Sequence, residues 1–218
     1  MLNHLRDNQL TRQDVDILNR HYQPGFSPDA ADGYVYLTTH NYKADRTNGE
    51  KLENLPGKTF KYSAVVDGKF EENIHPVDHV LALKKNAQVM FIKNDPSGEG
   101  QFFNGKIGKV AELTAKDIKV AFSDGTAPVW VEKYTWENKR FELNKETGEI
   151  EEKVIGNFVH FPLKLAWAIT VHKSQGLTFE KAIIDVSQAF AAGQVYVALS
   201  RLTSLDGLVL TSPFKHQG

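Results

Sequence analysis

The segment Ala168-Ile-Thr-Val-His-Lys-Ser-Gln-Gly-Leu-Thr-Phe179 carries the clearest structural signal in the chain. It begins inside an apolar run, Leu163–Thr170, that is typical of a buried strand, and it becomes polar over Thr170–Gly176. Hydroxyl groups, a lysine and exposed backbone N–H groups at the end of a strand are suited to binding a phosphodiester. Gly176 would also let the backbone approach a ligand closely. A polar connector with a capping serine fits the same residues, so the segment alone leaves both interpretations open.

The composition indicates a soluble globular protein. Of the 218 residues, 41% are hydrophobic and 24% are charged, and the length suffices for one ordinary domain plus a small one. No apolar run approaches the roughly 20 residues of a membrane helix, and residues 1–7 lack the apolar core of a signal peptide. The chain has no cysteine, which excludes disulfides and thiolate metal sites. We therefore expect a cytoplasmic protein with no membrane partner.

The charge and the less common residues narrow the classes of ligand. A net charge of -1 argues against a large electrostatic footprint for nucleic acid, but it leaves room for a local groove of hydroxyls, amides and lysines. His75 and His79 have helical spacing, but a proline stands between them and no carboxylate-rich segment accompanies them, so no metal site is predicted. We interpret the tryptophans as core or barrel residues, although exposed ones could stack on bases. They are Trp130, Trp136 and Trp167.

Strand and helix patterns alternate on both sides of the opening segment. Thr11 and Asp14 form a capping pair that starts a short helix over 10–21, and Pro24–Pro28 marks a connector. Strand, polar turn and helix then follow in the order that builds a parallel α/β sheet. The predicted strands are Tyr34–Thr38, Thr59–Val66, Leu163–Thr170, Ala182–Val186 and Leu208–Thr211, and the predicted helices are 41–54 and Gln194–Leu199.

Residues of about 86–161 have a different character, because short β-rich runs follow one another without a long helical pattern. Ser123–Thr126 and Asn144–Gly148 are predicted hairpin turns. We therefore expect a small β-barrel or sheet inserted into the α/β domain. Its predicted strands are Ala87–Ile92, Ile107–Ala111, Ile118–Phe122, Ala127–Val131, Arg140–Leu143 and Ile150–Phe158.

One segment of this region nearly matches a phosphate-binding loop. Gly100-Gln-Phe-Phe-Asn-Gly105-Lys106-Ile107 departs from the pattern GxxxxGK[ST] at Ile107, which replaces the hydroxyl that would hold magnesium. The residues after Lys106 are β-like, so no helix N-terminus is available for phosphate. We interpret the segment as a glycine-rich β-turn with Asn104-Gly105 at its tip. The chain accordingly has no phosphate loop of its own.

Two further segments have both a functional and a structural interpretation. Thr38-Thr39-His40-Asn41 lies at the turn after the first strand, where parallel sheets bind ligands, but Thr39 or Asn41 could simply cap the next helix. Gln194-Val-Tyr-Val-Ala-Leu-Ser-Arg201 ends an apolar helix in an arginine. That arginine either faces the negative end of the helix dipole or stabilises charge on a transferring γ-phosphoryl group.

The order of these segments resembles one family. Leu165–Gly176 followed by Gln194–Arg201 resembles the last two motifs of RecD-like helicases, the 5′-to-3′ branch of superfamily one that includes the petite-integration-frequency helicases. The resemblance extends to the family's entry into its inserted Src-homology-3-type barrel, its first motif of the second motor domain and the tail of its first motor domain. The matching segments are Gln88–Asn94 with Phe103–Gly108, Thr38–Asn48, and Leu5–Tyr22.

The resemblance implies an α/β fold, with a RecA-like parallel-sheet domain of the P-loop NTPase type that lacks the P-loop and carries an inserted SH3-like β-barrel. Residues 1–32 would be the tail of a preceding motor domain and a connector. Residues 33–86 and 162–218 would form the second RecA-like domain, and 87–161 the barrel with a hairpin that guides the strand or supports duplex splitting. The family's phosphate loop and magnesium-binding motif lie in a first domain that is missing here, so the natural protein is expected to be longer.

Residue roles follow from the same resemblance. Arg201 would be an arginine finger for ATP held with Mg²⁺ in the missing N-terminal domain, and Gln175 and Gly176 would line the nucleotide side. Thr178 stands where related motors often have a glutamate that contacts the ribose, so no ribose contact is assigned. The residues expected to hold single-stranded DNA phosphates are Thr39, Asn41, Thr170, His172, Lys173 and Ser174.

The predicted function is thus the C-terminal motor domain of an ATP-dependent 5′–3′ DNA helicase, which binds single-stranded DNA and does not hydrolyse ATP by itself. The alternative is a non-catalytic nucleic-acid-binding or adaptor module derived from a helicase domain. An unrelated small-molecule α/β enzyme would need a convergent acid–base pair, and the sequence offers none.

Overall fold

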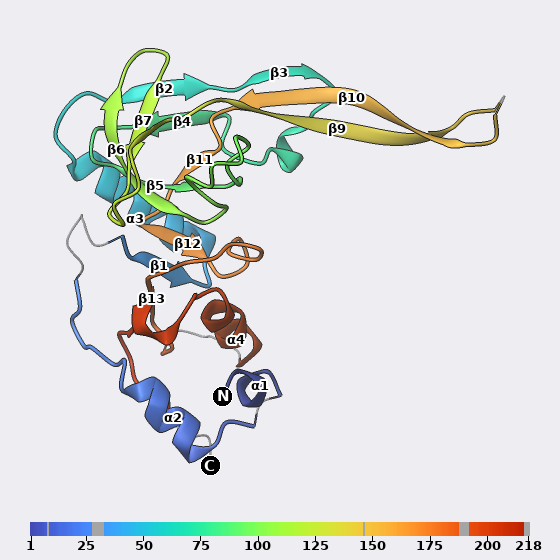
Figure 1. Cartoon of the computed structure of the whole chain (residues 1–218). Coiled ribbons are helices and arrows are strands. Elements are labelled where there is room, and N and C mark those ends of the chain that lie inside the picture. Colours follow the sequence, from blue (N-terminus) through green and yellow to red (C-terminus); the bar gives the residue numbers. More distant parts are fainter. Residues whose placement is uncertain (8, 28–32, 146, 188–191, 216–218) are drawn as a thin grey trace.

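The computed structural model describes residues 1–7, 9–27, 33–145, 147–187 and 192–215. Its lower part is a parallel sheet with helices beside it, and its upper part is built from antiparallel strands that end in a long projecting hairpin (Figure 1). The α/β fold with a parallel sheet is therefore confirmed. Within the described residues, no helix has both the length and the apolar character needed to cross a membrane.

The parallel sheet has the strand order β12-β1-β13-β14, and every neighbouring pair is parallel. Its strands are short apolar runs that are buried almost throughout, as expected where a parallel sheet is covered on both faces. They are β1 (Val35–Thr38), β12 (Ala168–Thr170), β13 (Ala182–Ile184) and β14 (Leu208–Leu210). Around them lie α1 (Leu2–Arg6), α2 (Arg12–Asn19), α3 (Asn41–Asn54) and α4 (Ala192–Ser200). Two 3-10 turns, η1 (Glu72–Ile74) and η2 (Leu205–Gly207), complete the helical elements.

Apolar side chains that are far apart in the sequence pack together in the hydrophobic core around this sheet. Leu18 of α2, Leu37 of β1 and Leu208 of β14 are almost fully buried in one cluster. The predicted capping pair starts α2, because Thr11 accepts a hydrogen bond from the Asp14 backbone and the Asp14 carboxylate accepts one from the Thr11 backbone. Helix α2 thus shares the core of the parallel sheet, and α1 lies against α4.

The upper part contains a five-stranded antiparallel sheet in the order β11-β5-β6-β7-β8, with its own apolar core. Gln88 joins it to the parallel sheet, because the buried Gln88 side chain donates to the carbonyl groups of Tyr34, at 2.6 Å, and Ala166, at 2.7 Å. The strands are β11 (Leu163–Leu165), β5 (Gln88–Phe91), β6 (Ile107–Leu113), β7 (Ile118–Ala121) and β8 (Val129–Trp130). Both predicted hairpins of this region are present.

The second hairpin is longer than predicted and belongs to a sheet of its own. Its strands β9 (Tyr134–Leu143) and β10 (Ile150–His160) pair along their whole length and project well beyond the rest of the molecule (Figure 1). At the base, β10 also pairs with β3 (Val65–Gly68). A separate pair joins β2 (Phe60–Ser63) to β4 (Val80–Leu83).

Two predicted strands are each divided in the structure. Thr59–Val66 becomes β2 and β3, because the chain pairs with β4 up to Ala64, whose N–H donates to the His79 carbonyl at 2.8 Å, and with β10 thereafter. Both pairings are antiparallel, so the prediction that this run joins the parallel sheet is wrong. Leu163–Thr170 becomes β11 and β12, because Leu165 still pairs with β5 while Ala168 already pairs with β1. Each run keeps its apolar pattern, but a change of partner strand interrupts it.

His160, at the end of β10, is fully buried, and neither of its ring nitrogens has a hydrogen-bond partner in the part of the chain that the structure describes. Burial, with a further contribution from nearby Lys133, lowers the pKa of His160 from 6.5 to about 4. The native state therefore holds His160 neutral, whereas the unfolded chain binds a proton as the pH falls through about 6.5.

Lowering the pH from 7 to 5 should therefore reduce the free energy of unfolding by about 2 kcal/mol through His160 alone. Chemical denaturation at both pH values measures this loss. The variant His160→Phe removes the titrating ring, so its stability should depend less on pH over this interval. An equal loss of stability in His160→Phe and in the unchanged chain would refute the assignment.

Candidate nucleic-acid and nucleotide site

The two polar turns predicted to bind phosphate lie side by side. β1 and β12 are parallel neighbours, and Thr38 pairs with Thr170 at their carboxyl ends. The N–H of Val171 donates to the Thr38 carbonyl at 2.8 Å. Because the strands run in the same direction, the segments that follow them, Thr39–Asn41 and His172–Gly176, leave from one edge of the sheet.

Two of the predicted phosphate-binding side chains build the turn after β12 from within. Ser174 is 0% exposed and Thr170 is 2% exposed. The Ser174 hydroxyl donates to the Val171 carbonyl at 2.6 Å, and the Thr170 hydroxyl accepts from the Lys173 N–H at 3.3 Å. In this conformation neither hydroxyl is open to a ligand, so both act on the shape of the turn.

The remaining residues of the turn face solvent. His172, Lys173 and Gln175 are exposed, and Gly176 has a φ of +79°, a left-handed backbone conformation that favours glycine. Lys164 of β11 lies near Lys173, since burial and then repulsion from Lys173 lower the pKa of Lys164. The turn therefore presents cationic and amide side chains at the sheet edge, with a second lysine nearby that the sequence interpretation did not include.

The turn after β1 has a related construction. The Thr39 hydroxyl hydrogen-bonds to Nδ1 of His40 at 2.8 Å, and Asn41 is exposed at the first position of α3. His40 is the N-cap residue of α3 and makes no capping hydrogen bond with its side chain. The simpler interpretation, in which Thr39 or Asn41 caps the helix, is therefore wrong.

Asn48 has a structural role that the sequence interpretation did not assign. Its side-chain amide donates to the Ala168 carbonyl at 2.8 Å, and its side-chain oxygen accepts from the Ala168 N–H at 2.9 Å. These two bonds hold α3 against the outer edge of β12. An asparagine two helical turns after Asn41 was the available signal, but only the fold reveals its partner.

Arg201 follows α4, and its backbone is hydrogen-bonded to Phe179, the last residue of the segment Ala168–Phe179. Its carbonyl accepts from the Phe179 N–H at 2.8 Å, and the Phe179 carbonyl accepts from the Thr203 N–H at 2.9 Å. The guanidinium donates to the Ser200 hydroxyl from Nε, at 3.3 Å, and from one terminal nitrogen, at 3.2 Å. Among the described residues, no carboxylate forms an ion pair with it. Its charge thus remains available to an anion.

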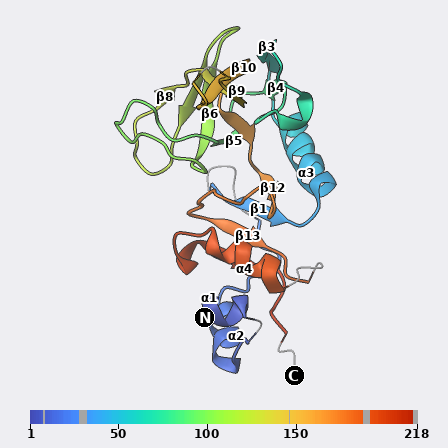
Figure 2. The same ribbon diagram turned by 90° about the vertical axis from the view of Figure 1, so that its right-hand side faces the viewer.

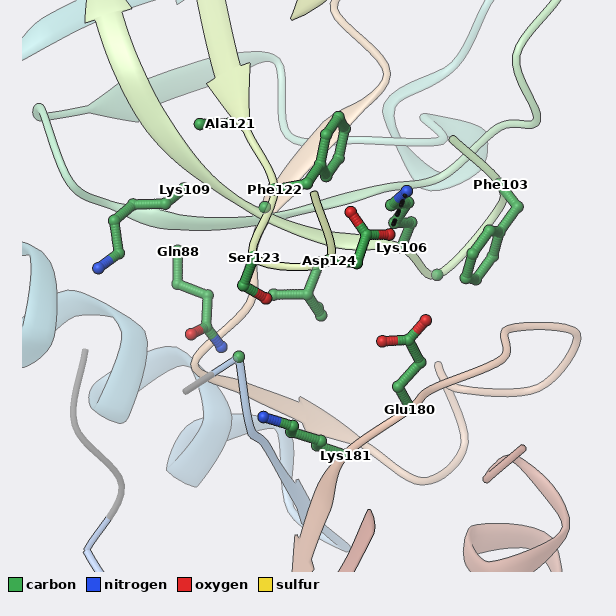
Figure 3. Close-up of a pocket in the computed structure, with 14 residues that line it drawn as sticks. Gln88, Phe103, Lys106, Lys109, Ala121, Phe122, Ser123, Asp124, Glu180 and Lys181 are labelled. Atoms are coloured by element: carbon green, nitrogen blue, oxygen red, sulfur yellow. Dashed lines mark ion pairs between the residues drawn. The ribbon is translucent and has the colours of Figure 1, made fainter. Parts of the chain in front are cut away.

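The segment that resembles a phosphate loop is a turn, as interpreted, with Asn104 and Gly105 at its tip. The Lys106 ammonium is buried and pairs with the Asp124 carboxylate at 2.8 Å, and it also donates to the Thr126 hydroxyl at 3.0 Å. The interaction with Lys106, followed by hydrogen bonds from Thr126, lowers the pKa of Asp124. The Lys106 ammonium is thus already paired within the protein. A cavity of about 240 Å³ lies beside this pair, between the antiparallel sheet and the segment that leads into β13 (Figure 3).

The comparisons with known proteins agree on one family. The ATP-dependent DNA helicase Pif1 of Psychrobacter sp. is 32% identical over 239 residues, covering 86% of this chain and 35% of the relative. That of Bdellovibrio bacteriovorus is 34% identical over 216 residues, covering 96% of this chain and 46% of the relative. No protein-family model matches. The chain thus spans less than half the length of these curated relatives.

Solved structures give the same result. The unliganded Pif1 from Bacteroides sp. has a TM-score of 0.88 and 37% identity, over 99% of this chain and 49% of that chain. The same comparison with Bacteroides Pif1 bound to single-stranded DNA gives a TM-score of 0.69. The similarity in fold and in sequence identifies this chain as a helicase domain. It belongs to the Pif1 family of superfamily 1 DNA helicases.

Proposed function

We propose that the chain is the second RecA-like motor domain of an ATP-dependent 5′–3′ DNA helicase, which binds the backbone of single-stranded DNA and supplies Arg201 to ATP bound in a preceding domain. The observation that carries the proposal is the placement of both polar turns at one edge of the parallel sheet. The Pif1 relatives, which are named as ATP-dependent DNA helicases, support it. So do neighbours whose structures include single-stranded DNA.

The turn after β12 would hold the strand with its exposed side chains. His172 and Lys173 would contact phosphates, while Thr170 and Ser174 fix the backbone from which they project. Thr39 and Asn41 would contact the neighbouring phosphates at the same edge. Because all these groups would contact the phosphate backbone of the DNA, binding would be independent of base sequence.

The nucleotide would lie on the side of Gln175, Gly176 and Arg201. The fork of Arg201 would stabilise the charge on the γ-phosphoryl group as it is transferred, with Mg²⁺ and the phosphate loop supplied by the preceding domain. Since the nucleotide would contact both domains, binding would close the cleft and release would open it. Phe179 connects Arg201 to the turn that holds the strand, so closure would move the two together.

Residues 87–161, which contain β5 to β8 of the antiparallel sheet and the β9–β10 hairpin, would correspond to the inserted SH3-like barrel of the family. The turn at Gly105 supports this proposal, because it lies directly against the backbone of Thr178, near the end of the segment Ala168–Phe179. The insertion would then sit on the motor domain at a defined point.

Removing the exposed lysine of the turn tests the proposal on this chain alone. Lys173→Ala should weaken binding of an oligothymidylate about five- to tenfold at low salt, because one phosphate contact is lost. The slope of log K against log salt should fall by about 0.7, the value expected for one phosphate of a single strand. Fluorescence anisotropy over a salt series measures both quantities.

Lys51→Ala is the matched control, since Lys51 is an exposed lysine in the last turn of α3, at the opposite end of that helix from Asn41. Its affinity and salt slope should equal those of the unchanged chain. The strand-binding part of the proposal fails if Lys173→Ala and Lys51→Ala behave alike.

A further inference from the structure

Three side chains at the base of the β9–β10 hairpin form an aromatic–lysine cluster, which we define as Lys93, Tyr134 and Trp136. The rings of Tyr134 and Trp136 meet edge to face, with centroids 4.8 Å apart. The Lys93 ammonium lies 4.7 Å from the Tyr134 centroid and 5.9 Å from that of Trp136. All three side chains are partly exposed, and among the described residues Lys93 has no carboxylate partner. The cluster thus offers solvent two rings and an unneutralised cation.

The two rings are held firmly in place. Trp136 lies opposite Phe158 across the hairpin, and its ring packs edge to face on that fully buried phenylalanine, at 5.8 Å. Tyr134 lies opposite the buried His160. Since Trp136 packs on a buried ring and Tyr134 packs on Trp136, stacking a planar ligand there would cost the protein little conformational freedom.

The cluster is connected through neighbouring strands to the turn after β12, Thr170–Gly176, which we call the motor turn. In Figure 1 the hairpin and the loop that follows β12 both extend toward the right, and Figure 2 looks onto that side, with β9 and β10 above β12. Lys164 belongs to β11, which pairs with β5 just before Lys93 and leads into β12. Lys93, Lys164 and Lys173 thus belong to connected elements between the base of the hairpin and the motor turn, in a chain whose net charge is only -1.

We propose that the aromatic–lysine cluster is a nucleobase-stacking site, which takes the part of a single strand that extends from the motor turn onto the base of the hairpin. A base would stack on Trp136 or Tyr134, and the Lys93 ammonium would pair with the adjoining phosphate. Stacking tolerates any base, because every base presents a π-face. The inference rests on the proposed function and adds to it a contact that recognises bases where the motor turn recognises only backbone.

The test compares oligothymidylates of increasing length, with and without abasic positions, by anisotropy on the whole chain. Trp136→Ala should weaken binding of long oligonucleotides about tenfold and leave binding of short ones, which reach only the motor turn, unchanged. The loss should disappear on a long strand with abasic sites in the part that reaches the hairpin. Trp136→Phe, which keeps a stacking ring, should retain most of the affinity.

Trp130→Ala is the control. Trp130 is 49% exposed and has the Lys119 ammonium 5.1 Å from its ring centroid, but it lies on β8, at the opposite end of the five-stranded sheet from β11. Its binding should match that of the unchanged chain. If Lys173→Ala weakens binding while Trp136→Ala does not, or if the loss in Trp136→Ala persists on abasic strands, the stacking site is refuted and the proposed function stands. If Lys173→Ala has no effect, the strand-binding part of the proposed function fails.

Discussion

Arg201→Ala, made in a protein that joins this chain to a phosphate-loop motor domain, is expected to lower kcat for ATP hydrolysis by about 10³- to 10⁵-fold, the contribution of arginine fingers in other motors. The reason is that the planar guanidinium can place two donors on the oxygens of a transferring phosphoryl group. Affinity for single-stranded DNA should change little, because the proposed phosphate contacts belong to the turn after β12. Steady-state hydrolysis and anisotropy measure the two effects separately.

The structure makes this variant a clean test. The backbone of residue 201, which closes the bridge to Phe179, remains after substitution, and the side chain makes no ion pair among the described residues that its removal would leave unpaired. Only the hydrogen bonds to the Ser200 hydroxyl are lost, and that hydroxyl also donates to the Val197 carbonyl at 2.8 Å. Stability should therefore be nearly unchanged.

Two further variants complete the test of Arg201. Arg201→Lys keeps the charge but not the fork, so it should recover only a small part of the rate. Arg46→Ala removes an exposed arginine that pairs with Glu50 on the surface of α3, and it should hydrolyse ATP at the normal rate. A normal rate in Arg201→Ala would exclude the arginine-finger role and favour a non-catalytic module.

Thr59–Val66 was wrongly expected in the parallel sheet, because an apolar run does not identify its partner strands. The strands that do form this sheet could be predicted, because each is a short apolar run. The two turns could be placed together for the same reason, since segments that follow parallel neighbours leave from one edge. What the sequence left undecided was which hydroxyl groups face outward. Thr170 and Lys173 were both predicted to contact phosphates, yet Thr170 is buried under the turn and Lys173 is exposed. That difference depends on the path of the backbone after β12, which local residue types do not determine.

The strand boundaries show a second limit. Thr59–Val66 has one continuous alternating pattern, but the point at which β2 ends and β3 begins depends on the partner strands β4 and β10, which lie far away in the chain. The contact between Gly105 and Thr178 is also long-range. From the sequence, Gly105 was only the tip of a turn, because a glycine gives no indication of the backbone that packs against it.

Gly105→Ala is expected to reduce the free energy of unfolding by about 3 kcal/mol. Gly105 has a φ of +106°, which side chains rarely adopt, and an added Cβ would lie 2.5 Å from the Thr178 carbonyl oxygen and 2.7 Å from its nitrogen. Backbone atoms cannot rotate away as a side chain can, so the turn or the motif must move. Chemical denaturation measures the loss.

Gly100→Ala distinguishes the effect of the left-handed backbone from that of the clash with Thr178. Gly100 also has a left-handed φ, +68°, but an added Cβ would have nothing within 4 Å. It should reduce the free energy of unfolding by only about 1 kcal/mol, the conformational part alone. The excess loss in Gly105→Ala is then the effect of separating the antiparallel sheet from Thr178, and hydrogen exchange should increase at the amides of Gln175–Phe179. Equal losses in the two variants would mean that the contact between Gly105 and Thr178 adds no stability. The antiparallel sheet would then be held on the parallel sheet by Gln88 and the β11–β12 connection instead.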